Sequence, residues 1–278
     1  EPGAQNSGHG TRLLFSGDLG HYDQPIVKDP AAPPDCDYLM VESTYGNRLH
    51  GDVDSETQMA RIINEAAERD GPILIPAFAV GRTQEVLYLI RELEDAKRIP
   101  ILPVVVDSPM AAQSTQVYNR WHKEHDEEYA SILAKKRHPL RTASMSTASS
   151  REESKKLNSM RGARIIISAS GMLTGGRVLH HALRVLPDEN ATIVFVGYQA
   201  AGTAGRRIQD GEPEVRIMKE WLPVRCRVEK VEGLQPTPKT VFTPHGEPKA
   251  AAAMAGHIRD RFGWNVEVPS YEETVELG

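Results

Sequence analysis

The chain has 278 residues, enough for one large domain or two ordinary ones. Hydrophobic residues make up 40% and charged residues 26%, as in soluble globular proteins, and no apolar run is long enough to span a bilayer. The formal net charge of −5 excludes a general attraction to nucleic acid, which could bind only at local basic clusters. Two cysteines, Cys36 and Cys226, are too few for a disulfide framework and predict reduced cytoplasmic thiols.

Strands and helices are predicted to alternate along most of the chain. Apolar runs predict strands at 12–15, 38–41, 73–75, 101–106, 164–167, 192–196, 239–242 and 266–268. Apolar residues at helical spacing predict a helix that begins with a capping box at Ser55, and further helices at 83–96, 109–128, 150–160, 176–185 and 247–262. The basic and Ser/Thr-rich segment 135–150 is predicted to be a surface loop. This alternation predicts an α/β architecture.

Polar or ionisable residues follow seven of the predicted strands. Ligands of α/β proteins bind where the carboxyl ends of the strands meet. The residues that would line such a crevice are Asp18, Glu42, Asp107, Ser108, Ser168, Ser170 and His245. The sequence contains no GxSxG nucleophile elbow, no P-loop, no GxGxxG after a strand and no HExxH. Carboxylates, a histidine and glycine-rich turns remain, and they favour metal-assisted hydrolysis or phosphate binding.

Seven motifs follow one another along the chain: LLFSGDLG, VESTYGNR, ILIPAFAVGRTQEVL, DSPMA, SASGMLTGGR, GYQAAGTAGRR and TPHGEP. In this order they resemble the β-CASP branch of the metallo-β-lactamase superfamily, over nearly the whole chain. The similarity is greatest to bacterial and archaeal RNA-processing members, relatives of the nuclease subunit of the cleavage and polyadenylation machinery. The resemblance implies a partial metallo-β-lactamase αββα domain at 1–48 and 223–278, with a β-CASP α/β domain inserted at 49–222.

The resemblance also implies roles for three residues at strand ends. Asp18 of the SGD motif would bridge two zinc ions, and His245 of the HGE motif would bind zinc through its imidazole. Glu42 of the VESTYG motif would serve catalysis by holding the histidine that protonates the leaving group. Taken alone, Asp18 is typical of a turn, Glu42 of a solvated strand end and His245 of a structural histidine.

Two glycine-rich turns are predicted to bind RNA phosphates, because N–H groups at a helix start attract anions and arginine adds bidentate contacts. The predicted phosphate-binding residues are Ser170, Gly171, Arg177, Gly202, Thr203, Gly205, Arg206 and Arg207. Turns that need positive φ would explain the glycines, but not the arginines. At most one of His180 and His181 should reach this region, because adjacent helical residues face apart. The HKEH run at 122–125 is predicted to be a solvated helix face.

Two motifs of the family are absent from the sequence: HxHxDH, which supplies most zinc ligands, and an FSAH-type motif with the general-acid histidine. We expect a longer parent protein to carry the first upstream of Glu1. The second, with about a helix of residues, would be missing at 233–234. Taken literally, Asp18 and His245 cannot hold two zinc ions, because catalytic zinc takes three protein ligands. The chain alone would then be inactive and the parent protein active.

The predicted function is zinc-dependent hydrolysis of phosphodiester bonds in single-stranded RNA. The protein would be a cytoplasmic metal-dependent ribonuclease without a membrane partner, and the family suggests a homodimer. One alternative is a catalytically inactive β-CASP subunit that binds RNA or acts as a scaffold; the absent motifs favour it, whereas the presence of Asp18, Glu42 and His245 speaks against it. The other is a metallo-hydrolase of a small ester, which the inserted domain disfavours.

Overall fold

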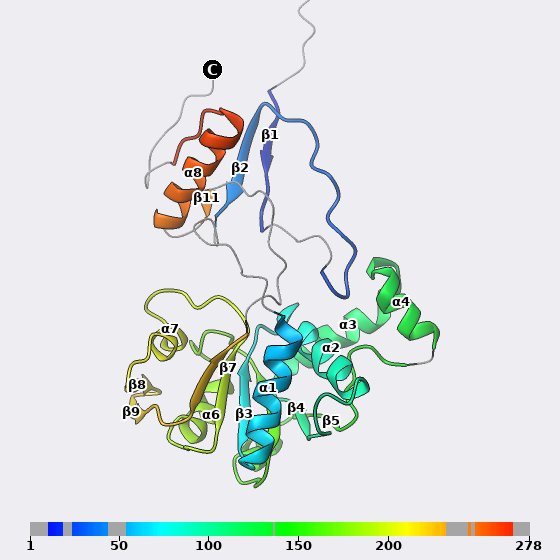
Figure 1. The fold of residues 1–278 in the computed structure, drawn as a ribbon, viewed down its shortest axis with the longest axis vertical. Coiled ribbons are helices and arrows are strands. Elements are labelled where there is room, and N and C mark those ends of the chain that lie inside the picture. Colours follow the sequence, from blue (N-terminus) through cyan, green and yellow to red (C-terminus); the bar gives the residue numbers. More distant parts are fainter. Residues whose placement is uncertain are drawn as a thin grey trace, which may run out of the picture. The chain divides into compact units, whose positions relative to one another are not determined.

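The chain separates into two compact units (Figure 1). The computed structural model describes residues 11–18, 24–43, 54–135, 137–231, 244–245 and 248–268. The smaller unit comprises Glu1–Gln24, Asp29–His50 and Pro236–Gly278, and the larger comprises Pro25–Lys28 and Gly51–Gln235. Both contain parallel strands and helices, so the predicted α/β fold class is confirmed.

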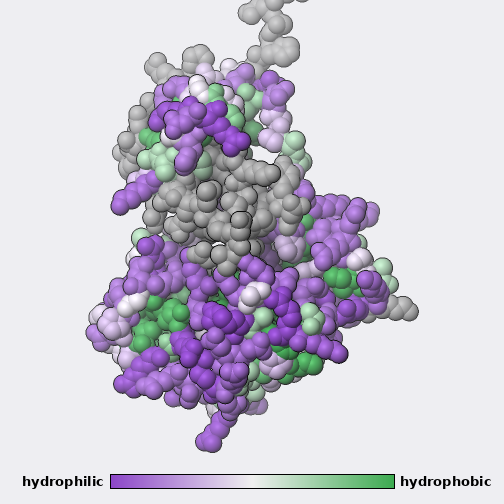
Figure 2. Space-filling model, in the orientation of Figure 1, coloured by the Kyte–Doolittle hydropathy of each residue, from purple (hydrophilic) through white to green (hydrophobic). Residues whose placement is uncertain are grey.

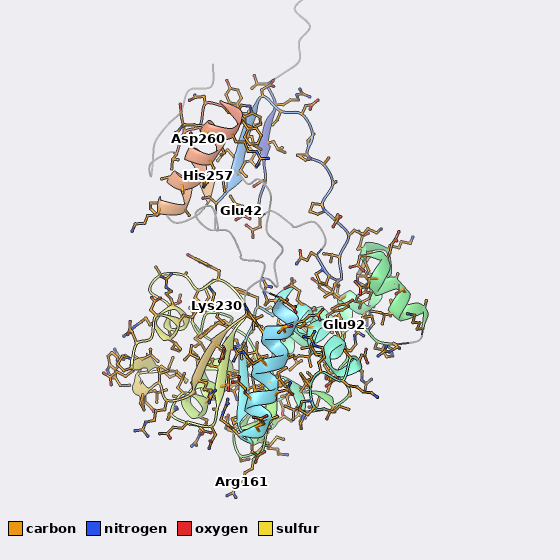
Figure 3. All side chains as sticks on the ribbon, viewed as in Figure 1. Glu42, Glu92, Arg161, Lys230, His257 and Asp260 are labelled. Carbon is orange, nitrogen blue, oxygen red and sulfur yellow. The ribbon has the colours of Figure 1, made fainter. Side chains whose placement is uncertain are left out.

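A six-stranded parallel sheet is the centre of the larger unit, with strand order β10-β7-β3-β6-β4-β5. Its strands are β3 (Pro72–Pro76), β4 (Val104–Val106), β5 (Met145–Thr147), β6 (Arg164–Ser168), β7 (Thr192–Phe195) and β10 (Arg227–Lys230). All strands run the same way, so their carboxyl ends lie at one edge. Figure 3 shows Lys230, at the end of β10, and Arg161, just before β6, at opposite ends of this unit.

Alternation along the strands sends apolar side chains to both faces of the sheet. Ile73 and Ile75 of β3 belong to a core with α1 (Ser55–Glu68) and α2 (Arg82–Asp95). Leu74, between them, belongs to a second core on the other face. That core includes α5 (Arg151–Leu157), α6 (Val178–Val185), α7 (Ala204–Gln209) and the hairpin of β8 (Glu214–Ile217) and β9 (Glu220–Pro223). Apolar cover on both faces explains why the four central strands, β3, β4, β6 and β7, were predictable from continuous hydrophobic runs.

Two local predictions about helix starts and lengths are wrong. Asp54, not Ser55, caps α1, and its side chain accepts a hydrogen bond from the N–H of Glu56 at 3.0 Å. The helix predicted at 109–128 is divided into α3 (Pro109–Arg120), a 3-10 turn at His122–Glu124, and α4 (Glu127–Ala134). The division occurs because Trp121 leaves helical geometry with ψ of 59° and Asp126 caps a new helix.

His125 is buried, whereas Lys123 and Glu124 are exposed, so the solvated face predicted at 122–125 is wrong for His125. Its ring lies 3.9 Å from the ring of Tyr129, centroid to centroid. The segment Pro25–Lys28 packs here. Ile26 is buried in the same apolar cluster as Tyr129, and Val27 forms a β-bridge with His125. Tertiary contact with a distant segment therefore overrides the local helical pattern.

The segment predicted as a loop at 135–150 contains β5, the edge strand of the large sheet, which pairs with β4. Sheet pairing supplies order that the Ser/Thr-rich composition did not predict. The domain boundary predicted at 222/223 lies before β10, and β10 pairs with β7 in the larger unit.

A three-stranded parallel sheet, order β1-β2-β11, forms the described part of the smaller unit together with α8 (Pro248–Phe262). Its strands are β1 (Leu13–Phe15), β2 (Tyr38–Glu42) and β11 (Pro244–His245). Leu13, Phe15 and Met40 are exposed, and the register puts them on one face of the sheet. An apolar sheet face of this kind is typical of a layer that packs against another layer.

The strand predicted at 266–268 is not formed. Residues 263–268, which follow α8, have no regular structure, and the guanidinium of Arg259 donates a hydrogen bond to the carbonyl of Val266. No strand pairing involves these residues in the described part of the chain. The strand predicted at 239–242 lies outside the described residues.

The surface of the larger unit turned to the viewer in Figure 2 is mostly hydrophilic, with apolar residues in separate patches. Within the described ranges, no helix is both long and apolar enough to cross a membrane.

The two cysteines differ in environment, which gives a simple test of the fold. Burial raises the pKa of the Cys226 thiol to about 12, while Cys36 is partly exposed. Because the thiolate is the reactive form, iodoacetamide at neutral pH should alkylate Cys36 in the native protein and Cys226 only after unfolding. Peptide mass mapping measures both rates, and equal labelling under native conditions would contradict the described packing.

Candidate phosphate-binding edge and metal-ligand edge

The carboxyl ends of β3, β6, β4 and β7 gather a series of turns at one edge of the large sheet. Hydrogen bonds continue past the strands: the N–H of Ala77 donates to the carbonyl of Ser168 at 3.1 Å, and that of Asp107 to Ile167 at 2.8 Å. The turns are therefore tied to the sheet at their base. This is the edge at which a ligand of an α/β sheet binds.

The two glycine-rich turns meet at this edge. The N–H of Gly205 donates to the carbonyl of Met172 at 3.2 Å, and the Gln199 amide donates to the carbonyl of Gly171 at 2.9 Å. A Cβ on Gly205 would overlap the side-chain oxygen of Gln199, so a larger residue would have to displace this buried side chain. The close approach of Gln199, and not a positive φ, explains this glycine.

Hydroxyl groups order both turns from within. The Ser170 hydroxyl accepts a hydrogen bond from the N–H of Thr174 at 3.1 Å. Thr203 caps α7, because its hydroxyl accepts from the N–H of Arg206 at 3.2 Å. Gly202, with φ of +82°, is exposed beside this cap. The predicted residues of the two turns are thus brought into one region, although their role in binding phosphate stays a prediction.

Arg206 and Arg207, predicted to bind phosphate, form ion pairs with acidic neighbours at the surface. The Arg206 guanidinium lies 2.9 Å from Asp210, and Arg207 lies 2.5 Å from Glu212. Arg207 also lies over the ring of Trp221. Exposed pairs of this type contribute little to stability, so an incoming anion can replace the carboxylates at small cost.

Arg177 is placed differently from these two arginines. One of its terminal nitrogens donates to the Asp107 carboxylate at 2.7 Å and to the carbonyl of Ala148 at 2.8 Å, and the other donates to the carbonyl of Ser149 at 3.3 Å. Its side chain is 21% exposed. The structure therefore engages Arg177 inside the protein, where the sequence predicted a contact with RNA phosphate.

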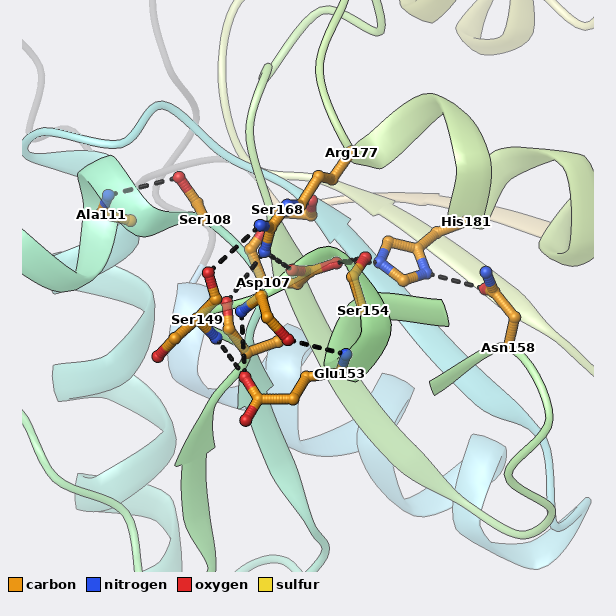
Figure 4. A network of polar contacts seen from close by, with 12 residues as sticks. Asp107, Ser108, Ala111, Ser149, Glu153, Ser154, Asn158, Ser168, Arg177 and His181 are labelled. Carbon is orange, nitrogen blue, oxygen red and sulfur yellow. Dashed lines mark hydrogen bonds and ion pairs between the residues drawn. The ribbon is translucent and has the colours of Figure 1, made fainter. Parts of the chain in front are cut away.

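Asp107 is the centre of a buried polar network (Figure 4). Besides Arg177, its carboxylate accepts from the Ser154 hydroxyl at 2.5 Å and from His181 at 2.6 Å. The other ring nitrogen of His181 lies 3.0 Å from the side-chain oxygen of Asn158. Burial raises the pKa of Asp107, but the hydrogen bonds from His181, Ser154 and Arg177 outweigh it, so the net pKa is lowered. The carboxylate is therefore held in its charged form.

This network was only partly foreseen from the sequence. Asp107 was expected at the sheet edge, and the expectation that only one of His180 and His181 reaches it is confirmed, since His181 is buried and His180 exposed. Ser154 and Asn158 were missed. They occupy a short helix and its end without an apolar or charged pattern that marks them, so the sequence carried no signal for them.

The smaller unit presents its own strand ends. Glu42 ends β2 (Figure 3), and in the strand register His245 of β11 lies opposite it. Asp18 follows β1 and is exposed. Ser16 connects the ends of β1 and β2, because its hydroxyl accepts from the N–H of Glu42 at 3.2 Å and donates to the carbonyl of Gly17 at 2.6 Å. Backbone pairing thus brings the three predicted positions to one edge of the small sheet.

Two carboxylates and one imidazole are suitable zinc ligands in kind, but they do not complete a metal site. Among the residues that the structure describes, no group of three or more His, Cys, Asp or Glu is placed to hold a metal ion. The roles predicted for Asp18, Glu42 and His245 therefore stay predictions.

Known protein families match both units. Residues 83–208 match the Beta-Casp domain, and residues 231–269 match the Zn-dependent metallo-hydrolase RNA specificity domain. The chain belongs to the β-CASP branch of the metallo-β-lactamase-fold family. The matched β-CASP domain runs from α2 to α7 and so includes both glycine-rich turns and the Asp107 network.

Several β-CASP relatives are similar over most of this chain. It is 34% identical to "Ribonuclease TTHA0252" of Thermus thermophilus, over 97% of the chain and 65% of the relative. It is 31% identical to "Transcription termination factor FttA" of Methanosarcina mazei, over 95% of the chain and 46% of the relative. An "RNase J-like protein" of Methanocaldococcus jannaschii is 28% identical, over 86% of the chain and 53% of the relative. The chain thus spans between about half and about two thirds of the length of these relatives.

Proposed function

We propose that the full-length protein is a zinc-dependent ribonuclease that hydrolyses phosphodiester bonds of single-stranded RNA in the cytoplasm, as a homodimer. The observation that carries the proposal is the meeting of two glycine-rich turns at the carboxyl edge of the β-CASP sheet, where Gly205 donates to Met172. The relatives named as ribonuclease, termination factor and RNase J-like protein support an RNA substrate.

The turns offer the groups that bind an RNA backbone. Ser170 and Thr203 carry hydroxyls, and Gly171, Gly202 and Gly205 allow close approach to the peptide backbone. Arg206 and Arg207 can exchange their exposed carboxylate partners for phosphates, which likewise accept bidentate hydrogen bonds from guanidinium. Such binding is largely independent of base sequence and weakens as salt rises.

Phe78 supports a single-stranded rather than a duplex substrate. Its ring lies against Gly171, since a Cβ on that glycine would be 3.3 Å from the ring, and 45% of the residue is exposed. An exposed aromatic ring beside a phosphate-binding turn can stack on an unpaired base, whereas bases in a duplex are already stacked. A paired helix would not use this feature.

The proposed metal requirement rests on the match to a Zn-dependent metallo-hydrolase domain. In the proposal two zinc ions are bound, with Asp18 and His245 among their ligands and Glu42 behind a general acid. The described residues do not make up this set alone, so further ligands must come from elsewhere in the full-length protein.

A cleavage assay with the full-length protein tests the proposal. A labelled single-stranded oligoribonucleotide and the same strand in a duplex are incubated with protein that is metal-loaded or treated with chelator. Cleavage of the single strand that disappears with chelator and returns with Zn²⁺ is the expected result. Light scattering on the same sample measures the proposed homodimer.

The same assay decides between the proposal and its alternatives. Tight RNA binding without cleavage by the zinc-loaded protein would favour a non-catalytic RNA-binding subunit, which the incomplete ligand set of the described residues makes the main rival. Hydrolysis of a small ester without RNA binding would overturn the choice of substrate.

A further inference from the structure

Arg177 joins three separate segments at the carboxyl edge of the large sheet. It belongs to the turn after β6, and it donates to Asp107 after β4 and to the carbonyls of Ala148 and Ser149 after β5. One guanidinium therefore fixes the glycine-rich turn to the ends of two neighbouring strands. A phosphate would have to displace a buried carboxylate to recruit this arginine, unlike the exposed pairs of Arg206 and Arg207.

Asp107 is itself held by hydrogen bonds from residues other than Arg177. Its exposed fraction is 0%, and one carboxylate oxygen accepts from Ser154 and His181 while the other accepts from Arg177. His181 belongs to α6, the helix that follows the turn, and its ring is in turn anchored by Asn158. Hydrogen bonds to a charged group are stronger than those between neutral groups. The turn between β6 and Arg177 is therefore fixed at both ends.

We propose that Asp107 and His181 are positioning residues that act through Arg177 to hold the 169–177 turn in the shape that receives an RNA phosphate. The inference rests on the proposed function, because it assigns no ligand of its own. Asp107 and His181 do not touch the substrate, and Arg177 serves as the clamp of the turn rather than as a phosphate ligand.

The turn needs such a clamp because its own sequence is permissive. It contains Gly171, Gly175 and Gly176, and glycine loses more conformational freedom on ordering than any other residue. Inside the turn the N–H of Thr174 donates to the Ser170 hydroxyl at 3.1 Å, and longer bonds run from the N–H of Ser170 to the carbonyl of Gly175 at 3.3 Å and from that of Val178 to Ala169 at 3.4 Å. None of these bonds reaches the ends of the neighbouring strands, as those of Arg177 do. A turn ordered in advance binds more tightly, because less entropy is lost on binding.

RNA affinity of the metal-stripped full-length protein tests the proposal without cleavage. Fluorescence anisotropy with a labelled single-stranded oligouridine is compared for wild type, His181→Phe and His181→Gln. The phenylalanine removes the donor to Asp107 and should raise Kd about tenfold. Glutamine keeps a donor near the position of the lost ring nitrogen, so it should restore most of the affinity. Hydrogen exchange of the amides in 170–176 should be faster in His181→Phe than in wild type.

Arg164→Gln is the matched control. Arg164 is buried at the opposite, amino end of β6, where it donates to the carbonyl of Gly162 at 2.7 Å, so its replacement lowers stability far from the turn. Arg164→Gln should lower Tm yet leave both Kd and exchange in 170–176 near wild type. If His181→Phe does not fold, Arg177→Lys replaces it in the comparison, with the same expected rise in Kd.

The outcomes distinguish a failure of the positioning role from a failure of the proposed function. Unchanged Kd and unchanged exchange in His181→Phe or Arg177→Lys would overturn the positioning role, and so would an equal loss of affinity in Arg164→Gln. If wild type does not bind the oligouridine at all, the proposed function fails; exchange in 170–176 then still reports whether the network orders the turn.

Discussion

Asp18→Asn in the full-length protein is expected to reduce cleavage of single-stranded RNA on the order of a thousandfold. Asparagine keeps the size of the side chain but removes the negative charge that a bridging zinc ligand needs. Asp18 is exposed after β1, so little stability should be lost. Initial rates of cleavage measure the effect, and zinc content by atomic absorption should fall in parallel.

Asp37→Asn is the control for this experiment. Asp37 is also a half-exposed carboxylate of the smaller unit, but it lies before β2, where it accepts from the N–H of Arg12 at 2.8 Å. Its replacement should leave cleavage and zinc content unchanged. If both variants cleave RNA at the wild-type rate, Asp18 is only a turn residue and the metal role assigned to the strand ends of the smaller unit is wrong.

Gly71→Ala is expected to lower the free energy of unfolding by about 3 kcal/mol. Gly71 directly precedes β3, and a Cβ there would overlap the carbonyl oxygen of Asn190, just before β7. The overlap is with backbone, so the amino ends of two central strands would have to separate. Urea denaturation measures the loss.

Gly256→Ala is the same chemical change without the overlap. Gly256 lies inside α8, where an added Cβ would meet no atom of a neighbouring described residue within 4 Å. Alanine favours a helix by about 0.5–1 kcal/mol over glycine, so this variant should be as stable as wild type or slightly more so. A Gly71→Ala protein with wild-type stability would show that β3 and β7 are not as close as described.

The strands β3, β4, β6 and β7 of the large sheet were predictable because each has apolar neighbours on both faces. The edge strands β5 and β10 carry exposed residues and were not predicted. The run around Ile73 and Ile75 is continuous for that reason. The split between α3 and α4 was not predictable, because the apolar pattern continues through Trp121. What accompanies the end of the helix is the β-bridge between His125 and Val27, a residue remote in sequence.

The candidate site was likewise predictable in part. Glycine-rich turns after strands indicated where the two turns would meet, since parallel strands end at a common edge. Their arginines could not be assigned from spacing, because partner choice depends on three-dimensional neighbours. Arg177 is drawn inward by a buried carboxylate, whereas Arg206 pairs with Asp210 one helical turn away at the surface.

The position of β2 between β1 and β11 has a consequence for the order of folding. β1 and β2 are close in sequence, but β11 reaches its partner only after the whole of Gly51–Gln235 has been made. Contacts between residues so far apart form slowly. During synthesis the large sheet can therefore form before β11 has been made, and one edge of β2 stays unpaired until β11 is available. In this period the unpaired edge of β2 is vulnerable to wrong pairing with other chains.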